Sequence, residues 1–390
     1  MSSGSASTRL REFAASFGPA WIVMIADVDA PSVLTAATVG ATYSYGLTWF
    51  FLALIPPLFV IQEASGRIGM ATGRGLGEVI RRNYSRRVAA LASFPMAVVS
   101  VVSYVAEFAG IAVGMQLIGV PPVVSVPAAY AAYIAVVVRR KYLTTEKALL
   151  VVSAVLIVSY LGSLFARGLV PSEPFYVSEE PGYFFLLAAC AGAVVMPFML
   201  FYQASATAEK RGTRLWAMRT ETLVGAVASE VGMIVVAMAT AGLSSSLDLA
   251  DPRALALALS SLAGAYAPYV FAVGLVAAAF LALVVISLGS SWAIVDTMGW
   301  KKESFLWVYV AESAPAVVIP ILYPEPLSLV LGLMVVFVFV LAGPGVLMGL
   351  LASDRRIMGA HASGTGWKAA YWLSLAAVVC FGILAVLSSV

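Results

Sequence analysis

Apolar runs of about 20 residues, separated by short polar segments, repeat along almost the whole chain. A helix of that length spans the hydrocarbon core of a bilayer, so each run predicts one transmembrane helix. The pattern predicts an all-α protein with eleven spans, approximately at residues 17–44, 47–68, 89–118, 121–138, 147–166, 183–206, 221–243, 267–298, 304–323, 326–351 and 367–388. Residues 1–16 are predicted to form a tail before the first span.

Composition and charge agree with this pattern and orient the chain. Hydrophobic residues make up 62% of the 390 residues and charged residues 11%, whereas soluble domains usually have about 25% charged residues. All of the 23 Lys and Arg except Arg167 and Arg253 lie on the side of the predicted spans that carries the N-terminus. Basic residues favour the cytoplasmic side, which predicts a cytoplasmic N-terminus and an external C-terminus in a multi-pass protein of the plasma (inner) membrane. Membrane orientation accounts for every basic cluster, so no nucleic-acid partner is expected.

The first predicted span is interrupted at its middle by Asp27-Val28-Asp29-Ala30-Pro31-Ser32. A carboxylate at the bilayer centre costs about 2.5–3.5 kcal/mol on insertion scales, and proline removes a backbone hydrogen-bond donor. Such a break is tolerated only where the acids and the freed backbone groups line a cavity inside the protein. The interruption therefore predicts a cation site.

The sixth span has a second interruption, at Met196-Pro197. Helix six comes five spans after helix one, and this odd offset gives the two halves opposite orientations. The spacing predicts an inverted repeat, with the first half at 17–166, the second at 183–351 and an additional helix at 367–388. In folds of this kind the broken helices face each other at the midplane and bind the ion.

The two interruptions carry a resemblance to a known family. Asp29-Ala30-Pro31-Ser32 resembles the Asp-Pro-Gly-Asn motif of the NRAMP divalent-metal transporters, and Gly192–Pro197 resembles their Met-Pro-His segment. Further matches occur at Gln62–Gly69, Thr72–Arg74, Ala106-Glu107 and Ser353–Arg356. The resemblance implies the LeuT-type inverted-repeat fold and metal transport by alternating access, with the metal as substrate and no resident cofactor.

Position by position, the resemblance implies a metal site made of the Asp29 carboxylate, the Ser32 hydroxyl, the Ala193 carbonyl and the Met196 thioether. A carboxylate replaces part of the ion's hydration, and a soft thioether favours transition metals over Mg²⁺ or Ca²⁺. Mn²⁺ or a similar ion is the favoured substrate. Further candidates for the cavity or a proton path are Asp27, Tyr104, Glu107, Gln203 and Glu230.

Several positions depart from the family pattern. Ser32 replaces the motif Asn, Phe198 and Gln203 replace two His residues, and Tyr104 stands where the family typically has an Asp, while Glu107 is kept. These changes remove titratable groups, so proton coupling is expected to be weak or absent.

The same residues bear on other functions and on the remaining acids. Two alternatives remain, an NRAMP-related magnesium transporter and a sodium-coupled carrier of organic solutes. Met196 argues against the first, because those magnesium transporters lack the site Met. Asp27 and Asp29 argue against the second, because its first break is usually uncharged. One His and two Cys do not supply a catalytic cluster, and no enzyme is predicted. Glu312 is a candidate for a proton or ion role. Glu63 and Asp296 are expected to pair with Arg67 and Lys301 or to extend their side chains to the cytoplasmic boundary.

Overall fold

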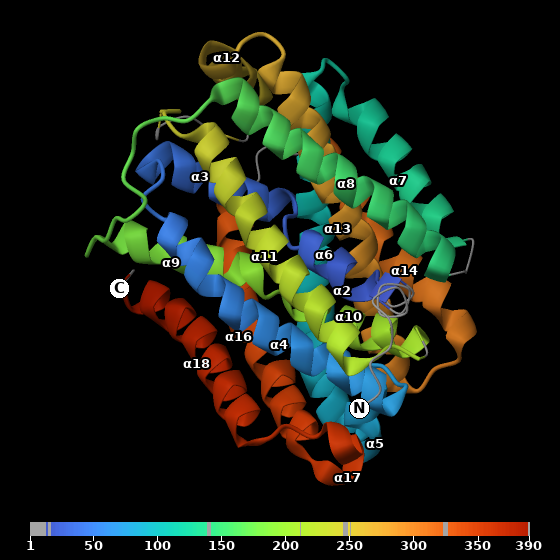
Figure 1. Ribbon diagram of the computed structural model, residues 1–390. Helices are drawn as coiled ribbons and strands as arrows, with labels where there is room; N and C mark the ends of the chain where they lie inside the picture. The colour runs from blue at the N-terminus through green and yellow to red at the C-terminus, as the bar shows by residue number, and fades with distance from the viewer. Residues whose placement is uncertain are drawn as a thin grey trace.

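Helices provide all the regular structure in the computed structural model, which describes residues 13–14, 17–138, 142–210, 212–244, 249, 251–322 and 327–388 (Figure 1). The α-helices are α2 (Pro19–Ile25), α3 (Ala30–Tyr43), α4 (Thr48–Thr72), α5 (Leu76–Asn83), α6 (Arg86–Leu117), α7 (Pro122–Val138), α8 (Tyr142–Arg167), α9 (Pro181–Val194), α10 (Pro197–Glu209), α11 (Leu215–Thr240), α12 (Pro252–Ala263), α13 (Ala267–Met298), α14 (Phe305–Ser313), α15 (Ile319–Leu322), α16 (Leu327–Ser353), α17 (Arg355–Met358) and α18 (Thr365–Ser388). Short 3₁₀ turns η1 (Lys302–Ser304), η2 (Ala314–Val317) and η3 (Gly359–His361) join some of them.

Every predicted span coincides with one helix or with a consecutive set of helices. Among the described residues, nine helices or continuous pairs are long and apolar enough to cross a membrane, and the bent pair α2 and α3 makes ten. The 17-residue α7 falls below that length. The protein is therefore an integral membrane protein, while the total of eleven spans stays a prediction.

Both predicted interruptions are present. Helices α2 and α3 meet at 48° across the non-helical residues 26–29, and Val195 and Met196 have non-helical dihedral angles between α9 and α10. Pro31 and Pro197 stand in the first turn of α3 and of α10. Proline is well tolerated there, because the first N–H groups of a helix have no intrahelical partner.

The half-helices pack against each other and on the centre of the bundle. Helix α2 contacts α10 and α3 contacts α9, which places the two breaks side by side. Helix α11 packs on both α2 and α3, and α6 packs on α3 and α13. Small residues permit these approaches: a methyl group added at Gly110 of α6 would overlap the Ala30 side chain, and one added at Gly192 of α9 would overlap a backbone carbonyl of α16.

Some elements were not predicted. Helices α5 and α12 contain 8 and 12 residues, too short for a search for membrane spans. The ninth predicted span is divided into η1, α14, η2 and α15, with Pro315 and Pro320 in its second half. Proline disrupts the regular hydrogen-bond ladder of a helix, which accounts for the division.

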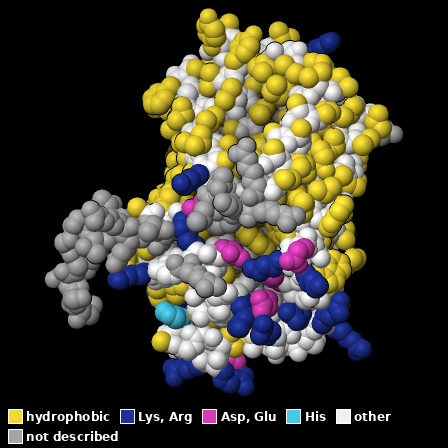
Figure 2. Space-filling model, turned by 90° about the vertical axis from the view of Figure 1, so that its right-hand side faces the viewer, with side chains coloured by type: hydrophobic (Ala, Val, Ile, Leu, Met, Phe, Trp, Pro, Cys, Tyr) yellow, Lys and Arg dark blue, Asp and Glu magenta, His cyan; other side chains and the backbone are white. Residues whose placement is uncertain are grey.

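Charged side chains gather toward one end of the molecule. Figure 2 shows a broad hydrophobic surface above, with most of the visible Lys and Arg near the lower end, where Figure 1 places α5 and α17. This separation fits the basic clusters that the sequence places on one side of the spans. We call this end of the bundle the basic end.

A buried ion-pair network ties α4 to α11 and to the segment before α18. The Glu63 carboxylate accepts hydrogen bonds from Arg67 Nε at 3.0 Å and from Arg219 Nε at 2.8 Å. Arg67 also donates to the His361 carbonyl at 2.6 Å and to Ser363 Oγ at 2.9 Å. The predicted pairing of Glu63 with Arg67 is therefore confirmed.

Of the two outcomes expected for Asp296, pairing with Lys301 or extending to the cytoplasmic boundary, the structure fits the second. The described residues show no ion pair between Asp296 and Lys301, and the Asp296 carboxylate instead lines a cavity. Both residues lie near the polar end of α13, where the exposed Lys301 is free to turn into solvent. Arg81 holds this end of α13 through the Asp296 backbone carbonyl, at 2.8 Å from its Nε.

Polar contacts hold the N-terminal end of α2, which lies toward the basic end of the bundle. The Glu221 side chain of α11 accepts hydrogen bonds from the backbone N–H groups of Gly18 at 2.7 Å and of Trp21 at 2.9 Å. Lys210 donates to the Phe17 carbonyl and to the Glu146 carboxylate. Gly18 has φ of 147° with Glu146 packed against it, so a side chain would not fit at this position.

Candidate metal-ion site

Asp29 lies in the first break and begins the second half-helix. It is the N-cap residue of α3, and its Oδ1 accepts a hydrogen bond from the Ser32 N–H at 2.7 Å. The side chain is 1% exposed. An N-cap carboxylate is favoured by the positive end of the helix dipole, which here holds the charge in place. The carboxyl group also interacts with the side chains of Ser32 and Glu107.

The Ser32 hydroxyl is buried beside this carboxylate. It lies close enough to Asp29 to interact with it, yet it forms no well-aligned hydrogen bond among the described residues. A serine inside a membrane helix commonly donates to a carbonyl one turn back, as Thr35 does to Pro31 at 2.9 Å. Because Ser32 lacks that bond, its oxygen remains available as a ligand.

Met196 and Ala193 lie in the second break. Met196 is the N-cap residue of α10 with an extended backbone, and its side chain is fully buried. Ala193 is the penultimate residue of α9. Carbonyls in the last turn of a helix have no intrahelical donor, so the Ala193 carbonyl is also available. The contacts of α2 with α10 and of α3 with α9 bring the second break, which holds this pair, next to the first break.

Carboxylates alone do not make a metal site in this region. The described residues hold no group of three or more His, Cys, Asp or Glu with metal-binding geometry. A metal ion between the breaks would need the thioether, the hydroxyl and the carbonyl in addition to the acid. The mixed ligand set that the resemblance implies would supply these groups.

Two further side chains face Asp29. Glu107 of α6 accepts a hydrogen bond from the Ala30 N–H at 3.2 Å, and its carboxyl group interacts with that of Asp29. Tyr160 of α8 is fully buried near both acids, and its hydroxyl has no hydrogen-bond partner among the described residues. Sequence reasoning identified Glu107 but missed Tyr160, because a tyrosine in an apolar run gives no signal until the fold brings α8 to the breaks.

The other candidates for a proton path point elsewhere. The Tyr104 hydroxyl donates to Glu312 at 3.3 Å, and Ser290 donates to the same carboxyl group at 2.8 Å. The Gln203 amide lies against Gly66 of α4. The Phe198 ring packs on Phe337 with ring centroids 6.1 Å apart. Among these three positions, none places a titratable group beside Asp29.

Asp27 and Glu230 form a separate contact at the first break. Asp27 Oδ2 accepts a hydrogen bond from Ser229 Oγ at 2.9 Å, and the neighbouring Glu230 interacts electrostatically with Asp27. Both acids are at most 1% exposed. Ser229 was not identified from the sequence, since only the fold shows that α11 packs on the break.

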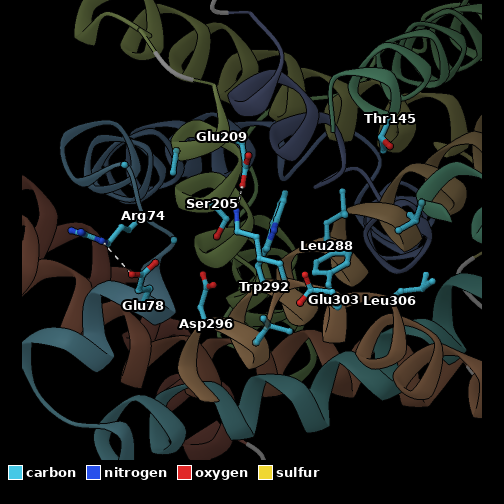
Figure 3. Close-up of a pocket in the computed structure, with 17 residues that line it drawn as sticks. Arg74, Glu78, Thr145, Ser205, Glu209, Leu288, Trp292, Asp296, Glu303 and Leu306 are labelled. Atoms are coloured by element: carbon cyan, nitrogen blue, oxygen red, sulfur yellow. Dashed lines mark hydrogen bonds and ion pairs between the residues drawn. The ribbon is translucent and has the colours of Figure 1, made fainter. Parts of the chain in front are cut away.

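A cavity of about 480 Å³ opens at the basic end between α5, α10, α13 and α14. Figure 3 shows Glu78, Glu209, Asp296 and Glu303 around it, with ion pairs from Arg74 to Glu78 and from Lys302 to Glu209, both 3.2 Å long. The four residues of the candidate site do not line this cavity and are buried. The site is therefore closed to solvent in this conformation.

Comparison with known protein families agrees with this architecture. The sequence model of the Nramp family, described as natural resistance-associated macrophage protein-like, matches residues 20–388. The chain belongs to the Nramp family. This match confirms the predicted family. Nramp proteins are transporters, so the protein is a transporter rather than an enzyme. Membership of this family also supports transport of divalent metal ions.

Solved structures similar to this Nramp chain share its fold. A mutant of the manganese transporter of Eremococcus coleocola has a TM-score of 0.78 at 16% identity, covering 98% of this chain and 88% of that one. MhsT in complex with L-phenylalanine has a TM-score of 0.65 at 13% identity, with coverages of 95% and 98%. The nucleobase-cation-symport-1 transporter MHP1 has a TM-score of 0.60 at 10% identity, with coverages of 95% and 91%. The predicted LeuT-type fold is confirmed.

Proposed function

We propose that this protein moves Mn²⁺ or a similar transition-metal ion across the plasma (inner) membrane by alternating access. The metal is bound by Asp29, Ser32, Ala193 and Met196. The observation that supports the proposal is the packing of two broken helices, one with a buried carboxylate and the other with a buried thioether at the N-cap position of its second half. A similar structure, from Eremococcus coleocola, is named a manganese transporter, which supports the same substrate.

Alternating access requires the site to open to each side in turn. In the proposed arrangement, residues 17–166 and 183–351 form two inverted repeats that move relative to each other around the breaks. The basic end faces the cytoplasm together with the N-terminus, because Lys and Arg favour that side. The 480 Å³ cavity then lies on the cytoplasmic route to the site.

Competition between metals tests the proposed substrate. With the purified protein in liposomes, Mn²⁺ uptake should be inhibited by Cd²⁺ at equimolar concentration and remain almost unchanged in a tenfold excess of Mg²⁺, because a thioether ligand favours the softer ions. A dye inside the liposomes reports the uptake. Inhibition by Mg²⁺ as strong as that by Cd²⁺ would instead favour the magnesium-transporting alternative. Uptake of a radiolabelled amino acid without metal uptake would favour an organic-solute carrier.

Metal uptake is expected to proceed without proton transport. Phe198 packs on an apolar ring, Gln203 cannot ionise, and the Tyr104 hydroxyl is bound to Glu312, so no relay joins Glu107 to solvent at these positions. Liposomes that contain a pH-sensitive dye should show Mn²⁺ entry with no acidification of the lumen, and an imposed pH gradient should change the rate by less than about twofold. Acidification driven by Mn²⁺ and lost in Glu107→Gln would contradict this and identify Glu107 as the proton carrier.

A further inference from the structure

Two buried carboxyl groups beside the candidate metal site have unused oxygen atoms. Asp27 Oδ1 and both carboxyl oxygens of Glu230 are inaccessible to solvent and have no hydrogen-bond partner among the described residues. Asp27 Oδ2 is held by Ser229 Oγ at 2.9 Å. Unsatisfied polar atoms at this depth are rare in proteins and call for an explanation, such as an ion that occupies the space between them.

No basic side chain balances these two acids. Within the described part of the chain, neither Asp27 nor Glu230 forms an ion pair with Lys or Arg. The buried Glu63, by comparison, is paired with both Arg67 and Arg219. Leaving two acids unpaired inside a membrane protein costs several kcal/mol for each ionised group, and a bound cation removes that cost.

The pair lies next to the candidate metal site, and Asp27 interacts electrostatically with Asp29, but the two acids are held by different helices. Asp29 is turned toward α3, through the Ser32 N–H, and toward Glu107 of α6. Asp27, in contrast, bonds to α11. It also follows the C-terminal end of α2, where the helix dipole is negative. The break therefore offers two separate environments for positive charge.

The chemistry of the second environment selects a hard cation. Its side-chain donors are two carboxylates and one hydroxyl, all of them oxygen, and the carbonyl groups at the break would add further oxygen ligands. Oxygen-only sites suit hard ions, unlike the thioether at Met196. A monovalent ion is favoured over a second divalent ion, because its Coulomb repulsion with a divalent metal at the nearby Asp29 is half as large.

We propose that Asp27, Ser229 and Glu230 form a second cation site that binds Na⁺ and couples its movement to that of the metal. The coupling part rests on the proposed transport function, while Na⁺ binding itself does not. Unwound backbone and half-helix C-terminal ends bind coupling ions in other transporters with broken helices. A Na⁺ gradient would then supply the driving force that the missing proton path cannot.

Thermal unfolding of the purified full-length protein tests the site without any metal. Replacing choline chloride by NaCl at constant ionic strength should raise the Tm of the wild type, and the rise should be absent in Glu230→Gln and in Asp27→Asn. In Na⁺-free buffer both variants should be at least as stable as the wild type, because each removes an unpaired buried acid. Glu221→Gln is the matched control. It lies on the same helix α11, its amide oxygen can still accept the bonds from Gly18 and Trp21, and its Na⁺-dependent rise should equal that of the wild type.

Uptake in liposomes tests the coupling. An inward Na⁺ gradient should accelerate Mn²⁺ uptake about fivefold or more over a choline gradient, and Glu230→Gln should lose the acceleration while still binding Mn²⁺. The proposed site would be overturned if Na⁺ did not change the Tm of the wild type, or if the Na⁺-dependent rise in Tm persisted in Glu230→Gln. Mn²⁺ uptake that ignores the Na⁺ gradient would overturn the coupling. If Na⁺ binds as expected but no divalent metal is transported, the proposed function fails and the Na⁺ site stands.

Discussion

Replacing Asp29 by Ala is expected to abolish Mn²⁺ transport and to weaken Mn²⁺ binding by more than about 100-fold. The reason is that Asp29 supplies the charged ligand among the four proposed. A 100-fold loss corresponds to about 2.8 kcal/mol, at 1.4 kcal/mol for each factor of ten. Isothermal titration calorimetry of the purified variant with Mn²⁺ measures the change. Micromolar binding retained by the variant would rule out Asp29 as the principal ligand.

Asp29 is also a helix cap, and two further variants separate the two roles. Asp29→Asn keeps an equally good N-cap side chain but removes the charge, so it should lose Mn²⁺ binding with little loss of stability. Asp251→Ala removes the same kind of cap, from the exposed N-terminus of α12, where Asp251 Oδ1 accepts a hydrogen bond from the Arg253 N–H at 2.9 Å. It should cost about 1 kcal/mol of helix stability and leave Mn²⁺ affinity unchanged.

Replacing Met196 by Ala is expected to change selectivity. Affinity for Mn²⁺ and Cd²⁺ should fall about tenfold, with Cd²⁺ affected at least as strongly, while affinity for Mg²⁺ should change by less than about twofold. The physical reason is that the thioether contributes most to binding of the softer ions. Calorimetric titrations with the three metals give the comparison directly, and equal losses for all three would mean that Met196 only fills space.

Met199 provides the matched control for this experiment. It lies three residues further along, in the first turn of α10, and like Met196 it is fully buried. Met199→Ala deletes the same atoms from the interior, so it should lower stability by about 2–5 kcal/mol through the cavity it leaves. It should not change the ratio of Mn²⁺ to Mg²⁺ affinity. A shift in that ratio equal to that of Met196→Ala would attribute the effect to packing.

The spans and the breaks could be predicted from the sequence because both depend on local properties. A 20-residue apolar run specifies a membrane helix by its length alone, and acids with proline at its centre specify an interruption. Asp29 could be selected for the same reason. Met196 needed the resemblance to the family as well, since most methionines in an apolar chain are packing residues.

Features that depend on contacts between distant segments could not be predicted. Tyr160 faces Asp29 only because α8 folds against α2, and Ser229 bonds Asp27 only because α11 packs on the first break. Tyr104 lies one helical turn from Glu107, yet its hydroxyl is bound to Glu312 on α14. Helices such as α5, with 8 residues, are too short to be recognised by the length of an apolar run.

The seven-residue helix α2 is held at one end by polar contacts. Its outer end is held by the two N–H bonds to Glu221 and by the Lys210 contact to the Phe17 carbonyl. Water can replace hydrogen bonds of this kind as they break, so releasing this end costs less free energy than separating an apolar interface of similar size. In the proposed transport cycle, the bonds to Glu221 would therefore limit how often the basic end opens.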